Sequence, residues 1–227
     1  MTDLLVDLPE DFDEFWSQVS DEARLVPLDF HREPAVGMVS SNGHRLDQIS
    51  FRGAGSTRLQ GWISYPEGAR RLPSFLWIPP YGRESLLPND FGTRAGMVSM
   101  SLNLHGLGAF HQEKYVPERG YFAEGAGDPS TWIFRKIVQH VLVAMRVLQA
   151  QSEADEDRVA VCGMSQGGGL AIWAGAISPI AKAVCADMPF LGQARNTLSR
   201  SGYRYPIKEL VDFMETETFG REKVLYT

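Results

Sequence analysis

The sequence predicts an α/β protein with a mostly parallel β-sheet and helices flanking it. Strand-length apolar runs alternate with helix-length amphipathic segments through the second half of the chain. The run at 74–78 is apolar throughout, as expected of a strand buried on both faces. Such alternation is typical of βαβ units with right-handed crossovers. Because the 227 residues contain no internal repeat or low-complexity linker, we expect a single domain over residues 1–227.

The N-terminal part predicts a helix followed by an antiparallel hairpin. Residues 9–24 carry large apolar side chains at three- and four-residue spacings, and the acidic residues at their start suit a helix dipole. Residues 46–51 and 59–65 each alternate with period two, and the glycine-containing segment 53–56 separates them. We therefore expect a hairpin extension ahead of the parallel sheet.

The remaining elements follow in alternation. Strands are expected at 74–78, 97–104, 158–163 and 182–187, and helices at 129–151, from 166 to about 177, and at 205–219. Asp128 is predicted to cap the long helix, with Pro129 at its first position. Residues 109–128 are rich in glycine, tyrosine and charge, so they are expected to form a loop.

Composition narrows the class of protein. A hydrophobic content of 44% and a charged content of 22% are those of a globular protein, and a net charge of −6 argues against nucleic acid or an anionic membrane as a partner. The acidic N-terminus lacks a signal-peptide pattern and no apolar run reaches membrane-span length, so the expected location is the cytoplasm. Cys162 and Cys185 lie in apolar runs and are predicted to be buried, reduced core residues, not a disulfide or metal pair.

The segment 163–167 carries the chemistry. Its pattern, Gly-x-Ser-x-Gly with Ser165 at the centre, follows a β-branched run and opens a small-residue helix. This is the nucleophile elbow of the α/β-hydrolase fold, in which the serine hydroxyl is exposed on a strained strand-to-helix turn. The flanking glycines are required where side chains would meet neighbouring backbone. Ser165 is therefore the candidate nucleophile.

An oxyanion hole of this type uses two backbone N–H groups. One belongs to the residue after the nucleophile, Gln166, and the other to the loop after an early strand. At the end of the 74–78 run, Pro79 and Pro80 have no N–H to donate. Tyr81 is the first residue there that can, and it is the expected second donor. Its ring could also pack beside the mouth of the pocket.

The base and the acid are harder to place. In this fold the acid and then the histidine follow the serine along the chain, but all five histidines of this sequence precede Ser165. His105 at a strand end is one substitute base, and His111 in the loop is a weaker one. His140 lies within the long helix and is expected to be structural. Asp187 could supply the acid or cap a turn.

A simpler interpretation is that these groups lie beyond Thr227. An α/β-hydrolase sheet needs about two further strand–helix units after this point, and these units carry the acid and the base. The strand at 182–187 would then be an exposed edge, and we expect the 227-residue chain to be marginally stable.

The chain resembles the acetyl xylan esterase and cephalosporin C deacetylase family of α/β-hydrolases. The residues that carry the resemblance are the segments 9–16, 59–62, 157–169 and 182–190. The elbow continues as Ser-Gln-Gly-Gly-Gly, which is more specific than the five-residue motif, and the last segment ends in Asp-x-Pro-Phe.

This resemblance implies deacetylation of small acetylated sugars such as xylo-oligosaccharides and of cephalosporin-type acetyl esters. It also implies that the protein uses no metal or organic cofactor, lies in the cytoplasm and forms a homo-oligomer, a ring-like hexamer. Ser165 matches the family's nucleophile, and Gln166 and Tyr81 match its oxyanion donors. The family's Asp and His would lie after Thr227, so this chain alone is expected to be inactive.

Two segments depart from the family pattern. Pro79-Pro80 stands where the family has His-Gly, and 103–108 begins with Asn103 where the family has Asp-x-Arg-Gly-x-Gly. Both line the expected pocket and bear on substrate preference. Two other functions stay open: a non-catalytic homologue that serves as an assembly or binding subunit, and a lactone hydrolase or peptidase on the same fold.

Overall fold

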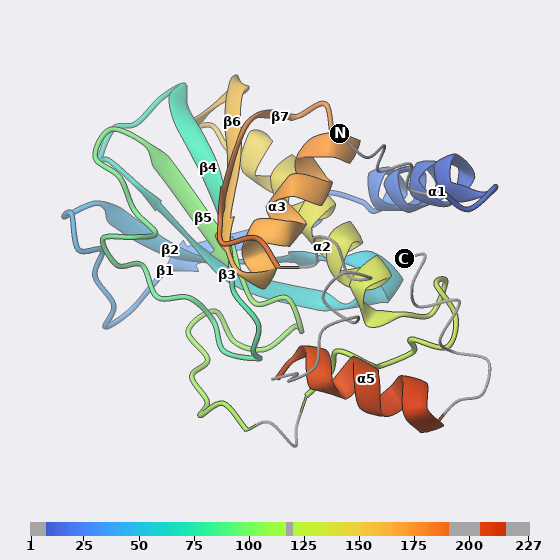
Figure 1. Ribbon diagram of the computed structural model, residues 1–227. Coiled ribbons are helices and arrows are strands. Elements are labelled where there is room, and N and C mark those ends of the chain that lie inside the picture. The colour runs from blue at the N-terminus through green and yellow to red at the C-terminus, as the bar shows by residue number, and fades with distance from the viewer. Residues whose placement is uncertain (1–7, 117–119, 191–204, 217–227) are drawn as a thin grey trace, which may run out of the picture.

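The computed structural model describes residues 8–116, 120–190 and 205–216. Seven strands form one sheet in the order β1-β2-β3-β5-β4-β6-β7 (Figure 1). The strands are β1 (Phe30–Pro34), β2 (Arg45–Arg52), β3 (Arg58–Tyr65), β4 (Leu72–Ile78), β5 (Val98–Leu102), β6 (Ala154–Met164) and β7 (Ala181–Asp187). The helices are α1 (Phe12–Leu25), α2 (Ile133–Gln149), α3 (Gln166–Ile177) and α5 (Ile207–Thr216), with a 3₁₀ turn at Ala54–Ser56.

The sheet has an antiparallel part and a parallel part. Strands β1, β2 and β3 form a meander, and β3 joins the rest of the sheet by antiparallel pairing with β5. Strands β5, β4, β6 and β7 are parallel. The α/β class and the hairpin of β2 and β3 are confirmed. Strand β1 was not predicted, because its sequence Phe-His-Arg-Glu-Pro lacks apolar alternation and its proline is tolerated only at a sheet edge.

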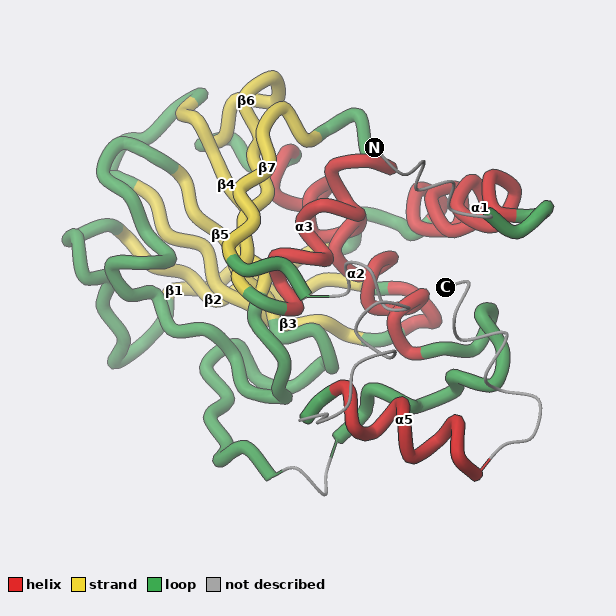
Figure 2. The backbone as a smooth tube through the Cα atoms, viewed as in Figure 1, coloured by secondary structure: helices red, strands yellow, loops and turns green. Residues whose placement is uncertain are grey.

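The core lies between the parallel strands and the helices. Helix α2 packs on β4 and β6, α3 packs on β6 and β7, and α1 lies against α2. Figure 2 shows these three helices gathered on one side of the sheet. Strand β4 and helix α2 supply many of the fully buried apolar side chains, including Leu76, Ile78, Val141 and Met145. Within the described residues, no helix has both the length and the apolar content needed to cross a bilayer.

The predicted start of the long helix is wrong. Helix α2 begins at Ile133, with Trp132 and not Asp128 at the N-cap position. The Asp128 carboxylate instead accepts the Ser130 N–H at 2.7 Å, and the Asp128 carbonyl accepts the Trp132 N–H. Pro129 therefore belongs to this turn and not to the first turn of the helix. Local side-chain-to-backbone bonds of this kind compete with helix initiation.

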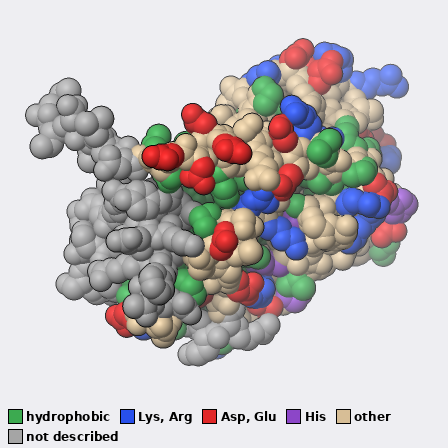
Figure 3. All heavy atoms as spheres, turned by 90° about the vertical axis from the view of Figure 1, so that its right-hand side faces the viewer, with side chains coloured by type: hydrophobic (Ala, Val, Ile, Leu, Met, Phe, Trp, Pro, Cys, Tyr) green, Lys and Arg blue, Asp and Glu red, His purple; other side chains and the backbone are tan. Residues whose placement is uncertain are grey.

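The predicted burial of the cysteines is also wrong. Cys185 is exposed and Cys162 is partly exposed. Every residue of β7 after Ala181 is exposed, because β7 lies at the edge of the described sheet. The expected exposed edge is thus present in the described structure, whereas the marginal stability of the chain stays a prediction. On the face that includes α1, acidic and basic side chains are interspersed (Figure 3).

Candidate active site

Ser165 occupies a strained turn between β6 and α3. Its backbone dihedrals are φ 54° and ψ −119°, a conformation that non-glycine residues adopt only when the surroundings enforce it. The Ser165 N–H donates to the Asp187 carbonyl at 2.9 Å, and the Ser165 carbonyl accepts the Phe190 N–H at 2.9 Å. The segment at the end of β7 therefore holds the turn from one side. The predicted strand, strained turn and helix are confirmed.

Two glycines allow the turn to sit against neighbouring backbone. A Cβ atom on Gly163 would lie well inside 3.0 Å of the Gly167 backbone, and one on Gly167 would collide with the Ile78 carbonyl oxygen and lie 2.8 Å from the Pro79 oxygen. These are the collisions that the motif predicts. Because Gly167 seats α3 on the end of β4, the residues after β4 are brought beside the elbow.

The N-terminus of α3 opens directly at Ser165. Gln166 is the first residue of the helix, and no side chain caps this end. The first N–H groups of a helix have no intrahelical acceptor, and the helix dipole makes this end favourable for negative charge. The Gln166 N–H therefore has the position in the fold that an oxyanion donor needs. Its side chain is fully buried and points into the protein.

Tyr121 links the elbow to the loop after β4. Its hydroxyl contacts the Gln166 side-chain amide at 3.0 Å and accepts the Gly82 N–H at 3.2 Å. Its ring stacks on the Tyr81 ring at a centroid distance of 4.6 Å. Sequence reasoning expected only a loop at 109–128. No local pattern marks a tyrosine that contacts partners about 40 residues away in each direction.

Helix α5 holds the Tyr81 side chain. The Tyr81 hydroxyl donates to one carboxylate oxygen of Glu209, and the other oxygen accepts the Phe122 N–H at 2.8 Å. Burial first, and then Glu209, raises the pKa of Tyr81, so its phenol stays protonated near neutral pH. Tyr81 thus follows β4 as predicted. Its ring stacks on Tyr121, and its hydroxyl is bonded to Glu209. Glu209 was not identified from the sequence.

Asn103 organises the loop after β5. Its amide oxygen accepts the N–H groups of His105 at 3.0 Å and Leu107 at 3.1 Å. Its amide nitrogen donates to the Arg83 carbonyl at 2.8 Å and to Ser85 at 3.0 Å. This buried side chain therefore joins the loop after β5 to the loop after β4. The donor bonds need an amide and could not be made by a carboxylate, which explains why asparagine fits here.

His105 packs on Tyr121 and not on the serine. The ring centroids are 4.3 Å apart, and the buried Nε2 atom of His105 has no hydrogen-bond partner among the described residues. Burial lowers the pKa of His105 to about 4, so the imidazole is neutral at pH 7.

The other candidate groups are occupied elsewhere. His111 contacts Glu113 at 3.0 Å. His140 is buried against the carbonyl oxygens of Leu104 and Ala54, which confirms a structural role. Asp187 contributes its backbone carbonyl to the Ser165 turn, and its side chain is exposed.

Across the described ranges, no histidine is hydrogen-bonded to the Ser165 hydroxyl.

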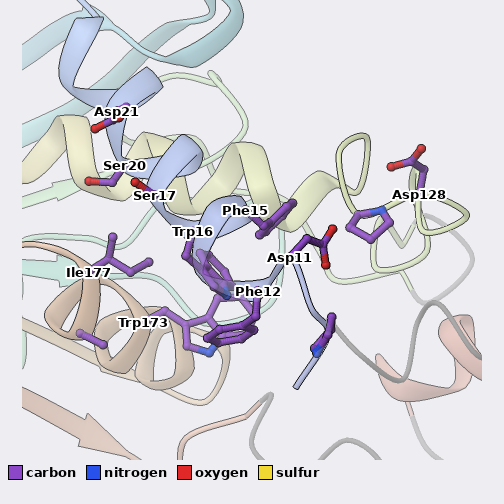
Figure 4. A pocket seen from close by; sticks show the side chains of 13 residues that line it. Asp11, Phe12, Phe15, Trp16, Ser17, Ser20, Asp21, Asp128, Trp173 and Ile177 are labelled. Atoms are coloured by element: carbon purple, nitrogen blue, oxygen red, sulfur yellow. The ribbon is translucent and has the colours of Figure 1, made fainter. Parts of the chain in front are cut away.

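A separate groove of about 990 Å³ lies between α1 and α3. Figure 4 shows the Trp16 and Trp173 side chains side by side in it, and their ring centroids are 5.6 Å apart. Asp11 and Asp21 contribute carboxylates to its lining. Neither Ser165 nor Tyr81 lines this groove, so it is distinct from the candidate active site.

Comparisons with known proteins agree with this geometry. Residues 6–227 match a protein-family model described as acetyl xylan esterase (AXE1). The chain is 23% identical over 209 residues to the acetyl esterase Axe7A of Xylanibacter ruminicola, which covers 87% of this chain and 47% of that protein. The chain thus spans about half the length of that curated relative.

Two solved structures have the same fold. One is an acetyl xylan esterase from Paenibacillus sp. R4, with a TM-score of 0.82 and 22% identity, covering 97% of this chain and 73% of that one. The other is acetyl xylan esterase 1 from Thermoanaerobacterium sp. JW/SL YS485, with a TM-score of 0.80, 24% identity and coverages of 97% and 72%. These likenesses show the α/β-hydrolase fold for this chain.

Proposed function

This chain belongs to the acetyl xylan esterase family, and from that membership we propose that Ser165 is the nucleophile of a carboxylesterase that removes acetyl groups from small acetylated sugars. The observation that carries the proposal is the Ser165 turn. A serine at φ 54° costs conformational free energy, on the order of 1–3 kcal/mol. In a nucleophile elbow, this strained conformation exposes the serine hydroxyl above the sheet at the N-terminus of a helix.

The proposed reaction is acyl transfer through an acyl-serine. The Ser165 oxygen attacks the acetyl carbonyl carbon, and the sugar oxygen leaves with a proton. Water then attacks the acetyl-serine, which releases acetate and restores the hydroxyl. The N–H groups of Gln166 and Tyr81 stabilise the oxyanion in both steps. A histidine must carry the proton in this mechanism, and we assign that role to none of the histidines described above.

We propose acetylated xylo-oligosaccharides as substrates, with cephalosporin-type acetyl esters as further ones. The support is family membership and the names of the relatives, which are acetyl or acetyl xylan esterases. Pro79 and Asn103 differ from the family pattern and lie on loops near Tyr81, so the acyl preference should be set there. We also propose that the protein is a cytoplasmic homo-oligomer. Its binding partner is a small acetylated substrate, and the net charge of −6 argues against nucleic acid or an anionic membrane as a partner.

Acetylation of Ser165 by p-nitrophenyl acetate tests the proposal. The 227-residue chain is incubated with the ester, quenched in acid and analysed by intact mass and peptide mapping. We expect one acetyl group on Ser165, absent in Ser165→Ala and retained in Ser130→Ala, whose exposed serine is the matched control. Acylation should need long incubation and an activated ester, and turnover should be slower still, because both steps use a base at the serine and no described histidine is hydrogen-bonded to it. Acetylation that is unchanged in Ser165→Ala would refute the assignment.

The non-catalytic alternative rests on a separate observation, that no histidine in the described part of the chain is hydrogen-bonded to the Ser165 hydroxyl. If the chain carries no acetyl group at Ser165 after this treatment, a binding or assembly subunit becomes the better proposal. A lactone hydrolase or peptidase would instead acylate at Ser165 but prefer lactone or peptide substrates in competition assays.

A further inference from the structure

Cys162 and Cys185 face each other across two neighbouring strands. They are direct partners in the parallel ladder of β6 and β7, which run side by side in Figure 1. Residues in direct register project from the same face of a sheet. Neighbouring strands lie about 4.8 Å apart, which falls within the Cα separations that disulfides span, about 4.4–6.8 Å. The backbone therefore places the two thiols within bonding reach.

The two thiols differ in exposure. Cys185 is exposed on the edge strand, whereas Cys162 is partly covered. Burial first, and then the neighbouring Cys185, raises the pKa of the Cys162 thiol to about 12. Thiolates and not thiols attack disulfides, so the raised pKa of Cys162 makes it a poor first attacker, and the exposed Cys185 should react first with a reagent in solution. Cys162 is then the nearest thiol available to resolve the product.

We propose that Cys162 and Cys185 form a reversible disulfide across β6 and β7 when the chain meets a small-molecule disulfide. In the first step the Cys185 thiolate attacks one sulfur of the reagent and expels the other as a thiolate. In the second step Cys162, after losing its proton, attacks the Cys185 sulfur of the mixed disulfide and expels the second reagent thiolate. Two protein thiols are oxidised, and one reagent disulfide is reduced to two thiols.

The geometry also predicts that this disulfide is easily reduced. In a direct parallel pair the Cβ atoms stay roughly as far apart as the strands, about 4.8 Å, whereas disulfides prefer a Cβ separation of about 3.8 Å. Closing that gap strains the ladder, and strained or exposed disulfides are the labile ones. The strain would fall on the segment that holds the elbow. Cys162 precedes Ser165 by three residues, and Asp187, two residues after Cys185, accepts the Ser165 N–H at 2.9 Å.

Oxidised glutathione is the probe. The folded chain is incubated with it, remaining thiols are blocked with iodoacetamide, and intact mass and non-reducing peptide maps are recorded. We expect a monomer lighter by two hydrogens, with no alkylated thiol and with the two cysteine peptides linked. Brief treatment with reduced glutathione should restore both thiols.

Single variants separate the two steps. Cys162→Ser should stop at a mixed disulfide of Cys185 with glutathione. Cys185→Ser should leave Cys162 unmodified over the same time, because that thiol is partly buried and has a raised pKa. A wild-type chain that stops at the mixed disulfide, that forms only intermolecular dimers or that stays fully reduced would overturn the proposal. None of these outcomes depends on Ser165 being a nucleophile, so the test is independent of the proposed function.

Discussion

Replacing Gly167 with alanine tests how tightly α3 is seated on β4. The added Cβ would overlap the Ile78 carbonyl oxygen and lie 2.8 Å from the Pro79 oxygen, and both atoms belong to backbone. Ile78 is also paired with Gly163 in the ladder of β4 and β6. Relief therefore requires α3 and the end of β4 to move apart, which disturbs the sheet pairing as well.

The expected magnitude follows from two opposing effects. Alanine inside a helix is favoured over glycine by about 1 kcal/mol. Overpacking a fitted contact costs about 1–3 kcal/mol and more where the neighbour cannot move. Because the neighbour here is a strand carbonyl, we expect the upper end of the overpacking cost, about 3 kcal/mol, which leaves a net loss of about 2 kcal/mol in the free energy of unfolding. Native domains have only about 5–15 kcal/mol in total, so the loss should be large in any assay.

Urea unfolding followed by circular dichroism measures this loss, with two other glycines as controls. Gly108→Ala adds a Cβ with no atom within 4 Å, and its stability should stay within about 0.5 kcal/mol of the parent chain. Gly175→Ala meets a Val184 side-chain methyl on the exposed edge strand, and it should fall between the two because that side chain can move. If Gly167→Ala unfolds at the same urea concentration as Gly108→Ala, α3 is not held against β4 as described.

Three further predictions concern the surroundings of the elbow. Glu209→Ala removes the acceptor of two hydrogen bonds and should lower the free energy of unfolding by about 1–3 kcal/mol. In that variant, Tyr81→Phe should cost less stability than it does in the parent chain, and equal costs in the two backgrounds would contradict the bond between Tyr81 and Glu209. Asn103→Asp replaces an amide that donates to a carbonyl oxygen with a carboxylate that cannot donate. Urea unfolding should show a loss of about 2 kcal/mol or more in the free energy of unfolding, and unchanged stability would contradict the hydrogen bonds of the buried amide. Burial lowers the pKa of both His105 and His140 to about 4, below the ordinary 6.5, so the unfolded chain binds more protons between those values. Stability should therefore fall as pH falls from 6.5 toward 4, by up to about 1.4 kcal/mol per pH unit for each histidine, and His140→Gln should reduce that slope in urea titrations at several pH values.

Local patterns were sufficient for the elements that position Ser165. The alternation of β2 and β3, the apolar run of β4 and the glycine spacing of the elbow are each contained within a few residues, and each folds as expected. Patterns failed where local and tertiary preferences compete. Asp128 closes a turn instead of capping α2, and β1 pairs at the sheet edge without the alternation that marks a strand.

The sequence by itself determined the α/β class and the strand-to-helix turn at Ser165, because these depend on spacing and on the absence of side chains at two glycines. Only the tertiary structure decided what surrounds the turn. Tyr121 and Glu209 meet Tyr81 from segments 40 and 128 residues away, and Cys162 meets Cys185 through strand register. Such contacts depend on how the segments pack in three dimensions, and no periodicity in a single chain records that packing.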